Sequence, residues 1–223
     1  MIQPIIKLMD VKKNFIDMPT NVFSQVNLMI EPGQLIAAKG TIGCGKTTLI
    51  NLICGLIKPD SGRIYVDNLD ITSMNYDTLS EFRANLFGIV PQKTNLVPEL
   101  TITQNLELPL MFKGIEKEQR RSIVNDMLKK IGILDMSDRL TRTLSVGESE
   151  IISIARSMIA DPPILLMDEP TEGLDPIISE MILSLIRGYS ILNNKTVFVT
   201  THDERILNVA DRVINVTTNM LYS

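Results

Sequence analysis

The 223-residue chain contains no tryptophan, a single histidine, two cysteines and only 4% aromatic residues. Its two cysteines, Cys44 and Cys54, form neither a disulfide framework nor a metal-binding pattern, which favours a reducing cytoplasm. The net charge of −4 supplies no basic field, so we expect no nucleic-acid partner. No apolar run approaches the roughly 20 residues that span a bilayer, and no signal peptide is expected.

The balance of 44% hydrophobic and 22% charged residues is that of an ordinary globular protein, and the length suits one domain, residues 1–223. Short apolar segments predict strands near residues 22–30, 34–38, 64–66, 164–167, 196–200 and 213–216, while helical patterns cover 45–56 and 177–189. Residues 101–160 have helical periodicity throughout. This alternation predicts an α/β fold with a mostly parallel sheet, a core of about 1–90 and 161–223, and an inserted helical sub-domain of about 91–160.

A phosphate-binding motif, G-x-x-x-x-G-K-[ST], follows the segment 34–38. Glycines let the backbone turn its N–H groups toward a phosphate, and the helix that follows offers its positive end to the same anion. A lysine adds a charge for the outer phosphates, and a threonine hydroxyl can ligate Mg²⁺. The alternative is a glycine-rich turn that binds nothing. The candidate binding residues are Gly40, Gly43, Cys44, Gly45, Lys46, Thr47 and Thr48.

Two carboxylates end the apolar segment 164–167. Asp168 and Glu169 would lie at the carboxyl end of a buried strand, where open α/β sheets bind their ligands. Asp168 would hold Mg²⁺ directly or through water, and Glu169 would polarise an attacking water. The alternative is a polar strand end that leads into the turn at Pro170.

Five further motifs, in the right order, make the chain resemble the ABC ATPase family over nearly its whole length. Each has a simpler interpretation alone: a loop amide, a structural histidine, a core aromatic ring, or a helix cap, including a capping box formed by Ser145 and Glu148. The motifs are Gln92 as the Q-loop glutamine, Leu144-Ser145-Val146-Gly147-Glu148 as the signature, Leu174-Asp175 as the D-loop, His202 as the switch histidine and Phe15 under adenine.

The resemblance implies a P-loop NTPase cassette with a RecA-like core, an antiparallel β edge and ATP with Mg²⁺ as ligands. Catalysis would fall to Glu169, His202, Lys46 and Gln92, and the metal to Thr47, Gln92 and Asp168. Ser145, Gly147 and Asp175 would complete the nucleotide site of a second copy, or of a related cassette, in an ATP-sandwich dimer. The implied protein is an ATPase on the cytoplasmic face of the membrane that powers a separate permease subunit.

The signature departs from the usual LSGGQ at two positions, Val146 and Glu148. A carboxylate near phosphate is repulsive, so we expect weaker ATP-driven dimerisation than in an LSGGQ relative. Residues 95–114, NLVPELTITQNLELPLMFKG, resemble the lipoprotein-release and macrolide-export branch, which implies an exporter of peptides, lipoproteins or drugs. Two alternatives stay open: a catalytically weak regulatory cassette, and a soluble ABC ATPase with no role in transport.

Overall fold

Two β-sheets carry the strands of the computed structural model, which describes residues 3–15, 22–192, 194–217 and 220–222. The six-stranded sheet has the order β10-β9-β3-β8-β7-β6, and all its pairs are parallel except β10 with β9. Its strands are β3 (Leu35–Lys39), β6 (Phe87–Val90), β7 (Ile164–Asp168), β8 (Thr196–Thr200), β9 (Arg212–Thr217) and β10 (Met220–Tyr222).

The second sheet is antiparallel, with the order β2-β1-β4-β5. In β2 the side chains alternate, so that Val26, Leu28 and Ile30 face the core as the sequence pattern predicts. The strands of this sheet are β1 (Ile6–Lys13), β2 (Phe23–Ile30), β4 (Ser61–Val66) and β5 (Leu69–Asp70).

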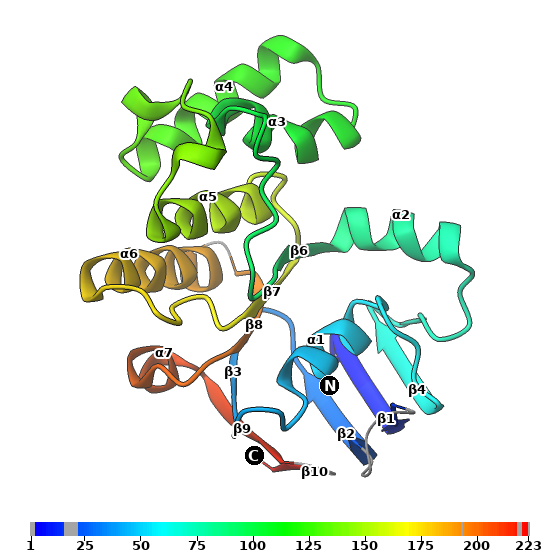
Figure 1. Cartoon of the computed structure of the whole chain (residues 1–223). Helices are drawn as coiled ribbons and strands as arrows, with labels where there is room; N and C mark the ends of the chain where they lie inside the picture. Colours follow the sequence, from blue (N-terminus) through cyan, green and yellow to red (C-terminus); the bar gives the residue numbers. More distant parts are fainter. Residues whose placement is uncertain (1–2, 16–21, 193, 218–219, 223) are drawn as a thin grey trace.

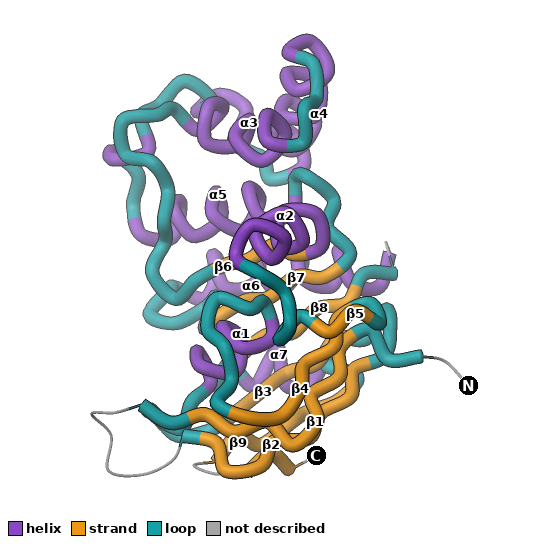
Figure 2. The backbone as a smooth tube through the Cα atoms, turned by 90° about the vertical axis from the view of Figure 1, so that its right-hand side faces the viewer, coloured by secondary structure: helices purple, strands orange, loops and turns teal. Residues whose placement is uncertain are grey.

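Helices α3, α4 and α5 gather at one end of the molecule, and α1 lies beside the antiparallel strands β1 and β4 (Figure 1). A view from the side shows α3 and α4 at the end farthest from β1, β2 and β9 (Figure 2). The helices are α1 (Lys46–Ile53), α2 (Tyr76–Leu86), α3 (Ile102–Phe112), α4 (Lys117–Lys130), α5 (Val146–Met158), α6 (Pro176–Arg187) and α7 (Glu204–Val209).

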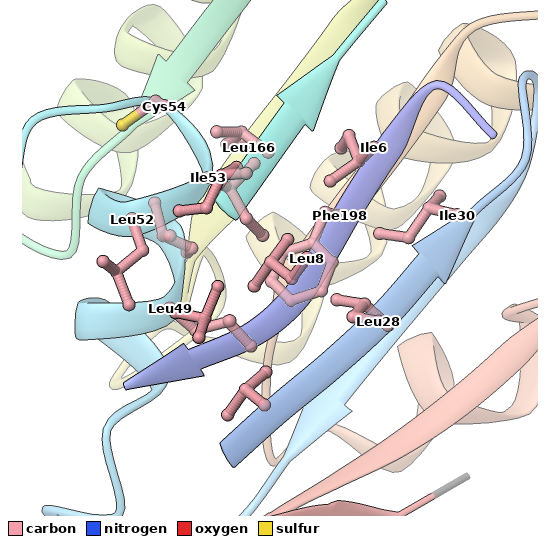
Figure 3. Close-up of a cluster of buried hydrophobic side chains, with 14 of the residues drawn as sticks. Ile6, Leu8, Leu28, Ile30, Leu49, Leu52, Ile53, Cys54, Leu166 and Phe198 are labelled. Atoms are coloured by element: carbon pink, nitrogen blue, oxygen red, sulfur yellow. The ribbon is translucent and has the colours of Figure 1, made fainter. Parts of the chain in front are cut away.

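The parallel sheet is buried on both faces, and its strands therefore divide their side chains between two hydrophobic clusters. In β7, Ile164 and Leu166 join a cluster with α1 and the antiparallel sheet, while Leu165 and Met167 join a second cluster with the helices. Figure 3 shows the first cluster, where side chains of β1, β2 and α1 meet Leu166 and Phe198 of the parallel sheet. This packing fixes the strand ends that carry the polar residues.

The strands predicted from the sequence at 164–167 and 196–200 are confirmed as β7 and β8. No element was predicted from the sequence for residues 76–86, where the structure has α2. Leu79 of α2 is buried, and Phe82 and Leu86 pack partly buried against the same cluster at helical spacing, so an apolar stripe is present in this segment. A second signal is the N-cap of α2, where Asn75 accepts a hydrogen bond from the Thr78 N–H at 2.9 Å.

A mainly helical stretch separates β6 from β7 in the chain, and α5 contacts both α3 and β6. Because α5 packs on the sheet as well as on its helical neighbours, it links the two parts of the molecule. The division into a core and a sub-domain of about 91–160 stays a prediction.

Candidate functional site

The phosphate loop joins the end of β3 to the start of α1, as its motif requires. Gly45 caps α1 with φ of 106°, and a Cβ there would lie 2.7 Å from Val22 Cγ1 and 2.9 Å from the Phe23 ring. Only glycine fits this position, for both conformational and steric reasons. The Cys44 side chain is buried, so any binding by Cys44 would rest on its backbone.

Lys46 holds together three segments that are far apart in the sequence. Its Nζ donates to the Gly40 carbonyl at 2.7 Å, contacts His202 Nε2 at 2.9 Å and lies 3.2 Å from Glu169 Oε1. His202 Nε2 also lies 3.4 Å from Glu169 Oε1, so the three side chains form one cluster. The Lys46 side chain is 9% exposed, and its charge is therefore balanced by Glu169 in a poorly hydrated site.

Asp168 accepts two hydroxyl hydrogen bonds at the carboxyl end of β7. Thr47 donates to its Oδ2 at 2.6 Å and Thr200 to its Oδ1 at 2.5 Å. Asp168 is 3% exposed, so both carboxylate oxygens are held in a fixed direction. Thr200 was not predicted as a site residue, although its position at the end of the β-branched segment 196–200 was a usable signal.

Glu169 adopts a left-handed backbone conformation with φ of 51°. This conformation costs a residue other than glycine about 1–2 kcal/mol, and such strain is concentrated at functional sites. Its N–H donates to the Thr200 carbonyl at 3.0 Å and lies 3.1 Å from Thr200 Oγ1. β8 therefore holds the turn that aims the Glu169 carboxylate at Lys46 and His202.

Gln92 follows β6 and donates from Nε2 to Glu172 Oε2 at 2.9 Å. Glu172 was missed in the sequence, where nothing sets it apart from other loop carboxylates. Phe15 lines the same cavity as Gln92, with Lys13 Nζ 5.5 Å from the centroid of its ring. The sequence placed both Gln92 and Phe15 at a nucleotide site, and the structure brings both to one cavity.

That cavity has a volume of about 460 Å³, which is in the range of small-molecule sites. It unites ten of the predicted residues with three that the sequence did not single out for the site. The lining residues are Phe15, Val22, Ile42, Gly43, Gly45, Lys46, Thr47, Thr48, Gln92, Asp168, Glu169, Glu172 and His202.

Ser145, Gly147 and Asp175 are not among the residues that line the cavity. Ser145 and Glu148 form the expected capping box at the start of α5, with Ser145 N–H donating to Glu148 Oε2 at 2.7 Å. Asp175 caps α6 by accepting from the N–H groups of Ile177 and Ile178. Each of these residues has a local structural role, and the chain does not bring them to its own nucleotide cavity.

The carboxylate of Glu148 is partly neutralised. The Ser145 N–H lowers the pKa of this carboxyl, partial burial opposes the effect, and Arg139, 3.2 Å away, adds to it. The charge is therefore retained near neutral pH, but it is shared with a cation. This pairing reduces the repulsion that the sequence predicts between Glu148 and an incoming phosphate.

The glycine-rich loop, the buried lysine and the hydroxyl-bonded aspartate define a P-loop nucleotide-binding protein. A model of the ABC transporter family matches residues 23–172. The chain belongs to this family, and it is an ATP-binding and ATP-hydrolysing cassette, as its resemblance predicted. The predicted P-loop ABC fold is also confirmed.

Among curated relatives, the ABC transporter ATP-binding protein YtrE of Bacillus subtilis is 37% identical over 188 residues, 84% of this chain and 81% of its own. The methionine import protein MetN of Brucella abortus is 35% identical over 212 residues, 95% of this chain and 57% of its own. The macrolide export ATP-binding/permease protein MacB of Vibrio parahaemolyticus is 31% identical over 214 residues, 95% of this chain and 33% of its own.

The solved dimeric cassette MJ0796, bound to ADP and Pi after hydrolysis, superposes with a TM-score of 0.92 at 32% identity. The match covers 98% of this chain and 97% of the cassette. Among the described residues, no helix is both long and apolar enough to cross a bilayer.

Proposed function

We propose that this cassette powers an exporter by binding ATP in the 460 Å³ cavity and hydrolysing it between two copies of the chain. The observation that carries the proposal is the meeting of Lys46, Glu169 and His202 in that cavity. A lysine with only a structural role would have no reason to lie with a carboxylate and a histidine at an open cavity beside a glycine-rich loop.

Phosphate binding falls to the loop amides, Lys46, Thr47 and Thr48. Lys46 now shares its three donors among the Gly40 carbonyl, His202 and Glu169, and it can exchange some of these partners for phosphate oxygens. Phe15 borders the cavity, where its ring can stack on the adenine.

The oxygen donors at the cavity fit a magnesium ion. Thr47 and Asp168 already lie in hydrogen-bonding contact, and Gln92 lines the same cavity with its amide. Mg²⁺ prefers such hard oxygen ligands and takes its remaining ones from water and phosphates. Thr47, Asp168 and Gln92 would hold the ion, which when bound neutralises charge on the phosphates.

Glu169 is the general base in this proposal. It orients a water molecule for in-line attack on the γ-phosphate and accepts its proton, while His202 aligns the same water and stabilises charge. Gln92 reports the state of the γ-phosphate through its bond to Glu172, which hydrolysis would rearrange. Catalysis then depends mainly on positioning and electrostatics.

The second copy supplies Ser145, Gly147 and Asp175. The start of α5 offers a hydroxyl group, free N–H groups and a positive helix end, all of which suit a γ-phosphate. Because these groups lie outside the chain's own cavity, a partner cassette is needed to bring them to ATP. The dimeric state of MJ0796 supports this arrangement.

The permease would contact a second cavity, of about 350 Å³, between α3, β6 and α5. Phe112 at its edge is 84% exposed, and the neighbouring Met111 is 50% exposed. Such exposed apolar side chains mark a protein interaction surface. Movement of the helical end on ATP closure would then push on the permease at the cytoplasmic face of the membrane.

Export of peptides, lipoproteins or drugs is the direction that residues 95–114 and the similarity to MacB support. The similarity to the methionine import protein MetN supports the opposite direction. A permease gene beside this one that encodes four membrane helices and a large outer domain would favour export. Co-purification with ribosomes or DNA would instead favour a soluble ABC ATPase.

Replacement of Glu169 by Gln tests the proposed chemistry. We expect steady-state ATP turnover to fall by 10²-fold or more, because the base is lost, while ATP still binds. A fluorescent ATP analogue measures binding, and phosphate release measures turnover. Normal turnover in Glu169→Gln would contradict the role of Glu169, and a wild-type chain with no turnover even beside its permease would favour a regulatory cassette.

A further inference from the structure

Two exposed aliphatic side chains lie beside the groups proposed to bind the γ-phosphate. Ile42 belongs to the phosphate loop and is 96% exposed, and Val146 opens α5 and is 75% exposed. Anion binding relies on N–H groups, hydroxyls and positive charge, so neither side chain serves it. Burying such aliphatic side chains would be favourable, so a partner that covers them would gain binding free energy.

Ile42 and Val146 lie on one continuous face of the chain. Ile42 lines the nucleotide cavity, and Val146 lines an adjoining cavity of about 270 Å³. The two cavities share Gln92, Glu169 and Glu172. A single partner that covers this face can therefore reach both aliphatic side chains.

We propose that Ile42 of one copy packs against Val146 of the partner subunit when ATP closes the dimer. The inference rests on the proposed function, in which Ser145 and Gly147 of one copy meet the phosphate held by the loop of the other. Val146 lies between those two residues, and Ile42 is next to Gly43 of the loop. Since neighbouring Cα atoms are only 3.8 Å apart, both side chains lie within one residue of groups that bind the same phosphate and can meet beside it.

Twofold symmetry makes this contact occur twice in each dimer. It adds an apolar contribution to an interface that is otherwise built from phosphate, carboxylates and cations. Apolar burial is not screened by salt, whereas the repulsion between Glu148 and phosphate is a charge effect. The contact between Ile42 and Val146 thus offsets the unfavourable carboxylate of Glu148 in the signature.

A double-mutant cycle tests the contact. In a Glu169→Gln parent with Mg-ATP, we would measure the dimer dissociation constant by analytical ultracentrifugation for Ile42→Ser, Val146→Ser and the double variant. Each single change should raise the constant by about 30-fold, because two symmetric contacts are lost. The double variant should cost little more than either single one, since both remove the same contact.

Leu56→Ser is the matched control, because Leu56 is a 54% exposed aliphatic residue outside both cavities. Affinity of each monomer for a fluorescent ATP analogue is measured separately, so that a loss of nucleotide binding is not counted as a loss of contact. Should Val146→Ser unfold by circular dichroism, Val146→Ala replaces it.

If each single variant has a dimer dissociation constant within twofold of the parent's, the two side chains do not contribute to the interface. If the free-energy costs of the two changes simply add in the double variant, the two side chains do not contact each other. Either result would contradict this inference and leave the proposed function intact. A parent that stays monomeric with Mg-ATP would overturn the proposed function and this inference with it.

Discussion

Glu150 is a carboxylate that α5 buries to 8% exposure, in the cavity next to the nucleotide site. Burial raises the pKa of this group from 4.5 to about 7, and among the described residues no charge or hydrogen bond offsets the effect. The sequence offered no sign of it, since a glutamate on a helix is normally solvated. At neutral pH the folded chain therefore carries this group partly protonated.

Replacing Glu150 by Gln tests the cost of that charge. The folded pKa is raised, so the protonated form is favoured in the folded state, and the free energy of unfolding falls as the pH rises from about 4.5 through about 7. At pH 8 we expect Glu150→Gln to be more stable by up to about 3 kcal/mol, and at pH 5 by about 1 kcal/mol or less. Urea unfolding at both pH values measures this difference.

Glu81→Gln provides the comparison, because Glu81 is exposed on α2. It should change the stability little at either pH. An equal gain for Glu150→Gln at pH 5 and pH 8 would show that the charge of the buried carboxylate is not the cause.

At the scale of elements, helix α5 approaches α6 most closely at Gly147. A Cβ at this position would lie 3.2 Å from Ile178 Cγ1 and 3.3 Å from Ile178 Cγ2. At Gly188, which ends α6 in a right-handed helical conformation, a Cβ would meet nothing within 4 Å. Alanine substitutions at the two glycines therefore distinguish the steric effect of a Cβ at Gly147 from the general gain in stability when alanine replaces glycine in a helix.

Gly188→Ala should stabilise the chain by about 0.5–1 kcal/mol, because alanine loses less backbone entropy. Gly147→Ala should gain less than this or become destabilising, since the start of α5 must move away from Ile178. The shift in the urea midpoint of the two variants measures the difference. Equal gains would mean that α5 and α6 do not constrain each other at this point.

Elements with a strong local pattern could be predicted from the sequence. The segment 196–200 is β-branched and apolar, and β8 has those bounds. The phosphate loop and the capping box of Ser145 and Glu148 also follow from short motifs, because each is made within a few residues. In contrast, α2 was not predicted, although Leu79, Phe82 and Leu86 recur at helical spacing, because only Leu79 of the three is fully buried and the rest of the segment is polar.

Contacts between distant segments could be predicted only in part. Motif order suggested that Lys46, Glu169 and His202 share a site, but their distances depend on the sheet order β3-β8-β7. The bonds of Gln92 to Glu172 and of Thr200 to Asp168 have no local pattern at all. Such pairs are set by tertiary packing, which a single sequence does not encode in short-range spacing.

At the scale of the whole molecule, each chain in the proposed dimer presents half of two nucleotide sites. One half is the cavity around Lys46, and the other is the capped start of α5 with Ser145 and Gly147. A closed twofold dimer brings each half to its complement, and opening after hydrolysis separates them. ATP thereby controls the distance between the two helical ends that would act on a permease.

The most direct test is the mass of Glu169→Gln in solution, measured by analytical ultracentrifugation with Mg-ATP and with Mg-ADP. The proposed arrangement predicts a particle of twice the 25.0 kDa chain mass with ATP and a single chain with ADP, because only the γ-phosphate reaches Ser145 and Gly147 of the second copy. A single chain under both conditions, with ATP at about 100 times its dissociation constant and even with a related cassette added, would contradict it.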